Sequence, residues 1–112
     1  MKFLVKKGDK SKPLLVNFSD NGRTFDINKI KELLYNATIY FSMKNIENNN
    51  YKILMKQGGV TRIKDSNEYA IFYKFDTKEI DEKAIYEGEF LIKTEEGLII
   101  LPINQKLIIS VS

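Results

Sequence analysis

The feature that most restricts the fold of this chain is the alternation of apolar and polar side chains along most of its length. Successive side chains of a β-strand point to opposite faces, so an alternating run presents one apolar face to a core. Three runs show this most clearly, and their apolar faces comprise Ala37, Ile39, Phe41 and Met43, then Tyr69, Ile71, Tyr73 and Phe75, then Tyr86, Gly88, Phe90 and Ile92. We expect Phe41, Tyr73 and Phe90 to form the middle of the core, because each lies in mid-strand.

Shorter apolar segments predict further strands between turn-forming residues. These segments are Lys2–Lys6, Leu14–Phe18, Tyr51–Lys56, Val60–Ile63, Leu98–Leu101 and Leu107–Val111. The pair Gly58-Gly59 separates two of them and is interpreted as a hairpin turn. Many short strands at this spacing predict an all-β fold, an antiparallel sandwich or barrel. A length of 112 residues predicts one domain spanning residues 1–112.

One segment departs from this alternation and predicts a short helix. Ile27, Ile30, Leu33 and Leu34 follow helical spacing, Asp26 or Asn28 is a candidate N-terminal cap, and Asn36 is suited to end the helix in a left-handed conformation. A helix of two turns is marginal alone, so we expect it to pack on the sandwich or on a partner. A second short helical turn is predicted over Lys78–Lys83.

Composition argues against most enzymatic chemistry. The chain has neither cysteine nor histidine, so it lacks thiolates and the usual general base and metal ligand. The acidic residues Asp76, Glu79, Asp81 and Glu82, near Glu87 and Glu89, lack the glycine-containing loop of a calcium site, and lysines lie among them. We therefore expect a non-enzymatic protein that uses no cofactor and no metal.

Charge and hydropathy also argue against two classes of partner. The net charge is +3, but the basic residues are mostly lysines interspersed with acidic ones, as on a solvated surface. We therefore expect no nucleic-acid partner. Apolar runs such as Leu98–Leu101 are far too short to cross a bilayer, and we expect no membrane partner.

Several large apolar side chains fall on faces that the alternation directs outward. Tyr40, Phe72, Ile85 and Leu91 belong to this group, and Ile30 and Leu34 lie on the apolar stripe of the predicted helix. Exposed apolar groups on a sheet indicate a covering partner. We predict a protein interface made of Ile30, Leu34, Tyr40, Phe72, Ile85 and Leu91. Packing beneath the helix and stacking of single-stranded nucleic acid remain alternatives at this point.

Taken in order, the landmarks of the chain resemble the immunoglobulin-like domain at the N-terminus of phage baseplate upper proteins. The resemblance rests on Lys7-Gly8-Asp9, Pro13–Phe18, Asp20-Asn21-Gly22, Ala37–Lys44, Tyr69–Phe75, Ala84–Phe90 and Leu101–Asn104. The run Ala37–Lys44 is similar to the family's "AxVxFxMR" strand, and Ala84–Phe90 to its "GxYxxEF" strand. Two features depart from the family: Lys29–Tyr35 resembles an insertion, and Ala84 stands where many relatives have glycine.

This resemblance implies an immunoglobulin-like antiparallel β-sandwich of seven to nine strands with one short inserted helix. It also implies a virion protein, made in the cytoplasm of the host bacterium, that docks as an adaptor or decoration module on other capsid, neck or tail proteins. Self-association is a further option. The alternative is a carbohydrate- or host-surface-binding module on the same fold, for which the polar loop Asn45–Asn50 is a conceivable contact.

Overall fold

The strands lie where the alternation of side chains predicts them. A computed structural model describes residues 1–17, 34, 36–63, 69–103 and 105–112. Within these residues the strands are β1 (Lys2–Val5), β2 (Leu14–Asn17), β3 (Thr38–Asn45), β4 (Tyr51–Gln57), β5 (Gly59–Arg62), β6 (Tyr69–Tyr73), β7 (Ala84–Thr94), β8 (Gly97–Leu101) and β9 (Leu107–Val111). The turn predicted near Lys78–Lys83 forms slightly earlier, as the 3-10 helix η2 (Thr77–Ile80).

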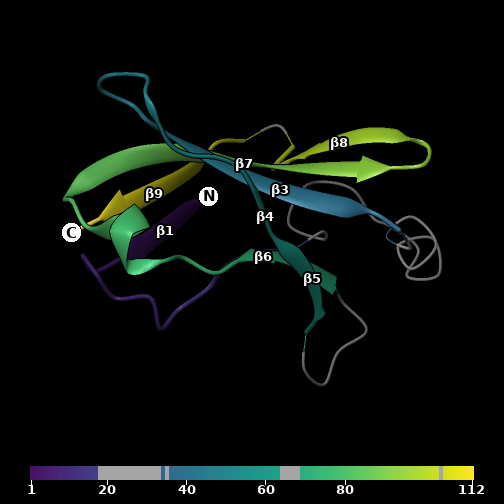
Figure 1. Ribbon diagram of the computed structural model, residues 1–112, viewed down its shortest axis with the longest axis horizontal. Helices are drawn as coiled ribbons and strands as arrows, with labels where there is room; N and C mark the ends of the chain where they lie inside the picture. The colour runs from purple at the N-terminus through teal and green to yellow at the C-terminus, as the bar shows by residue number, and fades with distance from the viewer. Residues whose placement is uncertain (18–33, 35, 64–68, 104) are drawn as a thin grey trace.

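The strands form two sheets that pack face to face. The larger sheet has the order β1-β9-β7-β3-β4, and the smaller sheet has the order β2-β6-β5. Strand β7 is long enough to pair with β9 along its first half and with β8 along its second half. Figure 1 shows the larger sheet above the layer that contains β5 and β6. The predicted all-β sandwich is confirmed.

One strand pair departs from the predicted antiparallel arrangement. The N-terminal strand β1 pairs in parallel with the C-terminal strand β9, with Lys2 opposite Ile108 and Val5 opposite Val111. Parallel neighbours need a long connection, and here most of the chain supplies it. Local alternation cannot reveal this pairing, because it contains no information on strand direction.

The core lies between the two sheets and is rich in aromatic rings. Phe41, Tyr73 and Phe90 are buried, as the sequence predicts. The ring centroid of Phe41 lies 4.7 Å from that of Tyr73 and 4.9 Å from that of Phe90. Since Tyr73 belongs to the smaller sheet and the other two to the larger one, this cluster joins the sheets. Aromatic pairs at such separations add stability beyond the apolar area they bury.

The pair Gly58-Gly59 forms a corner between the sheets, and the predicted hairpin turn is wrong. Strand β4 pairs with β3, whereas β5 pairs with β6, so the chain changes sheets between them. The corner brings the backbone close to Phe72: a Cβ on Gly58 would lie 2.6 Å from the Phe72 carbonyl oxygen, and one on Gly59 would lie 2.6 Å from its ring. Glycine is needed here because of this close approach.

A bulge in β4 accounts for the buried hydroxyl group of Ser42 on the neighbouring strand β3. The pairing of β3 with β4 shifts between Phe41 and Met43, and Met55 adopts a left-handed φ of 51°. The Met55 N–H donates a hydrogen bond of 2.8 Å to the buried Oγ of Ser42. A bulge leaves backbone groups without ladder partners, and the serine satisfies one of them.

Most of the predicted inserted helix, including Ile30, lies outside the described residues. Leu34, the described residue of this segment, packs against the core, and Asn36 after it has the left-handed φ of 65° expected for a residue that ends a helix. Among the residues that the structure describes, no helix has the length and apolarity needed to span a membrane.

Candidate interaction surface

The outer face of the larger sheet carries an apolar row that crosses three strands. Tyr40 on β3 lies opposite Leu91 on β7, and Leu91 lies opposite Ile100 on β8. Leu98 adds a fourth apolar side chain two residues before Ile100 on the same face of β8. We refer to Tyr40, Leu91, Leu98 and Ile100 as the apolar patch.

The exposure of the apolar patch is greatest on its β8 side. Leu98 is 64% exposed and Ile100 is 53% exposed, whereas Tyr40 and Leu91 are half-buried. Large apolar side chains that meet in adjacent strands and remain exposed are costly in water and typical of a surface that a partner covers. The patch therefore has the character of a binding surface.

Among the described residues, the other members of the predicted interface do not join this patch. Ile85 is 45% exposed on the same face, but it lies six positions from Leu91 along β7, or about 20 Å at strand rise. Its neighbours across the sheet are Ser110 and then Leu4. The predicted interface is therefore not one continuous surface on the larger sheet.

Phe72 lies on the other sheet altogether. It pairs with Leu15 and Gly59, and its ring lies over the corner glycine with the Lys74 Nζ 5.9 Å from its centroid. Leu34 packs against the chain's own core. Of the five predicted interface residues that the structure describes, only Tyr40 and Leu91 lie together, and Ile30 lies outside the described residues.

The sequence did not identify Leu98 and Ile100 as surface residues. Residues 98–101 are Leu-Ile-Ile-Leu, an uninterrupted apolar run from which the outward face cannot be recognised. The pairing of Leu91 with Ile100 settles which of the four side chains point outward. Knowledge of that register was the missing signal.

Two of the acidic residues, Glu79 and Asp81, pair with different lysines. Glu79 is buried, and its carboxylate accepts hydrogen bonds from the Tyr73 hydroxyl at 2.9 and 2.8 Å and from the Asp76 N–H at 2.8 Å. The Lys56 Nζ forms an ion pair with Glu79 Oε2 at 2.9 Å. No cluster of three or more potential metal-binding side chains occurs in the described part of the chain. Glu79 instead fastens η2 to β4 and β6.

The Tyr73 hydroxyl should make the free energy of unfolding decrease as the pH rises into the alkaline range. Burial, followed by the hydrogen bond to Glu79, raises the pKa of Tyr73 above its ordinary value of 10.0. Above pH 10 the unfolded chain loses this proton while the folded chain retains it, so stability falls as pH rises. Burial also raises the pKa of Tyr86, which should lower stability at alkaline pH in the same way.

We expect the urea midpoint to decrease as the pH is raised from 9 to 11, because the unfolded chain increasingly releases the tyrosine protons that the folded chain retains. Tyr73→Phe should make the slope of this decrease shallower, although the variant is less stable at neutral pH. Urea denaturation followed by circular dichroism at several pH values measures both slopes. A wild-type midpoint that is constant or rises over this range would contradict the assignment.

Comparison with known proteins gives this chain no relatives: no family model, no curated protein and no solved structure matches it.

Proposed function

We propose that this chain is a non-catalytic assembly module of a phage virion, which docks on a neighbouring virion protein through its apolar patch. The observation that carries the proposal is the apolar row Tyr40–Leu91–Ile100 across three paired strands, which is half-buried at Tyr40 and Leu91 and exposed at Ile100. Aromatic and large aliphatic side chains at the centre of a surface, with polar groups around them, are typical of protein interfaces.

The charges around the patch favour a protein partner over a nucleic acid. On the outer face Lys44 lies opposite Glu87, and Lys93 lies on the same strand as Glu89. A nucleic-acid surface needs basic groups that follow the phosphate backbone, without acidic groups between them. A partner with a flat apolar centre and a rim of both charge signs matches this face.

The resemblance to the baseplate domain supports the choice of a virion protein as the partner. The three alternating runs that carry most of that resemblance are β3, β6 and β7, which form the centre of the sandwich. The resemblance itself concerns assembly and contributes no catalytic or cofactor residues. The proposed location in the virion depends on this sequence evidence.

Incorporation of surface variants into particles tests this proposal. We expect Leu91→Lys combined with Ile100→Glu to retain the wild-type melting temperature within a few degrees and to be depleted from purified virions. The matched control is Leu15→Lys, which alters a leucine that is 52% exposed on the smaller sheet. Quantitative mass spectrometry of the particles measures copy number.

Normal incorporation of the folded double variant would reject the patch as the docking surface. Absence of the wild-type chain from purified particles would reject the virion role. Sedimentation of the purified chain tests whether the patch binds a second copy instead. Dimerisation that depends on concentration and is abolished by the double variant would show this.

A further inference from the structure

A polar pocket lies at one end of the sandwich, apart from the apolar patch. Its volume is about 180 Å³, and its lining comes from the β3–β4 loop, the start of β4, β7 and the segment that follows η2. The lining residues are Asn45, Asn48, Asn50, Tyr51, Lys52, Glu82 and Tyr86. The pairing of Asn45 with Tyr86 and of Lys44 with Tyr51 brings these distant segments together.

The loop Asn45–Asn50 is held in place by hydrogen bonds between its own residues. The Glu47 N–H donates to Asn45 Oδ1 at 2.8 Å, and the Asn50 N–H donates to Asn48 Oδ1 at 2.9 Å. These amide oxygens already accept backbone hydrogen bonds, so the NH₂ groups are the donors that Asn45 and Asn48 can offer to a ligand. The Asn50 side chain can both donate and accept. The loop therefore presents amide groups in fixed positions.

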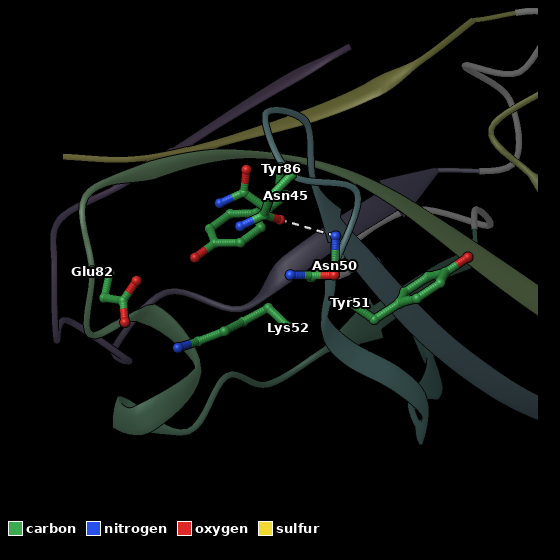
Figure 2. A pocket seen from close by; sticks show the side chains of 7 residues that line it. Asn45, Asn50, Tyr51, Lys52, Glu82 and Tyr86 are labelled. Carbon is green, nitrogen blue, oxygen red and sulfur yellow. Dashed lines mark hydrogen bonds between the residues drawn. The ribbon is translucent and has the colours of Figure 1, made fainter.

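On the side of the pocket opposite the loop, Glu82, Lys52 and Tyr86 supply a carboxylate, an ammonium group and a hydroxyl. Figure 2 shows the Glu82 carboxylate, the Lys52 ammonium and the Tyr86 hydroxyl turned toward one another, while the Tyr51 ring extends from the rim. Lys52 is held by an ion pair of 2.8 Å with Asp81, whose pKa is lowered by that hydrogen bond. Tyr86 is only 1% exposed, and burial raises its pKa. A tyrosine hydroxyl is protonated at neutral pH even at its ordinary pKa of about 10, so this group can donate as well as accept a hydrogen bond.

The balance of these groups indicates a neutral ligand rich in hydroxyl groups. One cation, Lys52, is offset by Asp81 and Glu82, which disfavours phosphates and other anions. Sugar hydroxyls both donate and accept hydrogen bonds, as do asparagine amides, and carboxylates accept from them. The volume lies below the roughly 300–1,000 Å³ of sites for drug-sized ligands, and suits a single ring.

We propose that this pocket binds one neutral monosaccharide unit at the end of a glycan. Asn45, Asn48 and Asn50 would contact the sugar from the loop, and Glu82 would accept hydrogen bonds from its hydroxyls on the other side. The pocket shares no residue with the apolar patch, so this site is independent of the proposed assembly function.

NMR titration of the ¹⁵N-labelled chain tests the site. The probes are glucose, galactose, mannose, N-acetylglucosamine and rhamnose, each added separately, with inorganic phosphate as the anionic comparison. A dissociation constant on the order of 1 mM is expected for so small a site. We expect at least one sugar to produce saturable shifts in the side-chain NH₂ signals of Asn45, Asn48 or Asn50.

Two pocket variants and one control give the test its specificity. Asn50→Ala and Glu82→Gln should each weaken binding by about three- to tenfold, which corresponds to the loss of one hydrogen bond. Gln57→Ala, at the far end of β4, should bind like the wild type. No saturable shift with any sugar, shifts with phosphate alone, or binding that survives both pocket variants would each overturn the proposal.

Discussion

Replacing Phe41 with alanine should lower the free energy of unfolding by about 3–5 kcal/mol. Phe41 is fully buried, and its ring contacts Tyr73 and Phe75 of the other layer as well as Phe90 of its own sheet. The substitution removes these contacts and leaves a cavity between the sheets, which a close-packed interior refills poorly. Since a domain of this size is stable by about 5–15 kcal/mol, the loss is a large fraction of the total.

Leu54→Ala is the matched control for this experiment, because Leu54 is also apolar but is exposed on β4. Its effect should stay within about 0.5 kcal/mol. Urea denaturation of the two variants and the wild type measures the difference. A loss below about 1 kcal/mol for Phe41→Ala would mean that the inward and outward faces of β3 are reversed.

Replacing Glu79 with alanine should lower the free energy of unfolding by about 2–4 kcal/mol. The change leaves the buried Tyr73 hydroxyl and the Asp76 N–H without their acceptor. Lys56 loses its partner as well, but it is exposed and regains water, so the cost stays below that of breaking a fully buried ion pair.

Glu79→Gln should lie between the alanine variant and the wild type, because it keeps one acceptor oxygen. The control is Glu95→Ala, an exposed carboxylate in the turn between β7 and β8, which should change stability by less than about 0.5 kcal/mol. Equal stabilities for Glu79→Ala and Glu95→Ala would show that the hydrogen bonds around Glu79 contribute nothing measurable.

The sequence predicted strands and their faces well, because both depend on local alternation. Phe41, Tyr73 and Phe90 were assigned to the core from period two alone, and all three are buried. Ser42 shows the limit of the pattern. The alternation places it on the outward face, yet it is buried. Its hydroxyl accepts a hydrogen bond from the Met55 N–H at the bulge in the neighbouring strand β4. A bulge is a property of two paired strands, and one strand's sequence does not reveal it.

Errors arose where the answer depends on which strands become neighbours. A Gly-Gly pair is equally suited to a hairpin and to a corner between sheets, and only the partners of β4 and β5 distinguish them. Tyr40 and Phe72 both point outward, but they belong to different sheets and cannot form one surface. Likewise, the polar loop was noticed as a possible glycan contact, whereas Glu82 and Tyr86 reach it only through the fold.

If this chain docks in a virion through the apolar patch, the patch should be shielded from solvent within the particle. Hydroxyl-radical footprinting of the free chain and of the chain within purified particles tests it most directly, with side-chain oxidation read by mass spectrometry. Tyr40, Leu91 and Leu98 should lose reactivity in the particle, while Leu15, on the smaller sheet, should keep it. Equal reactivity of the patch in both samples, with Leu15 protected instead, would show that this chain does not dock through the apolar patch.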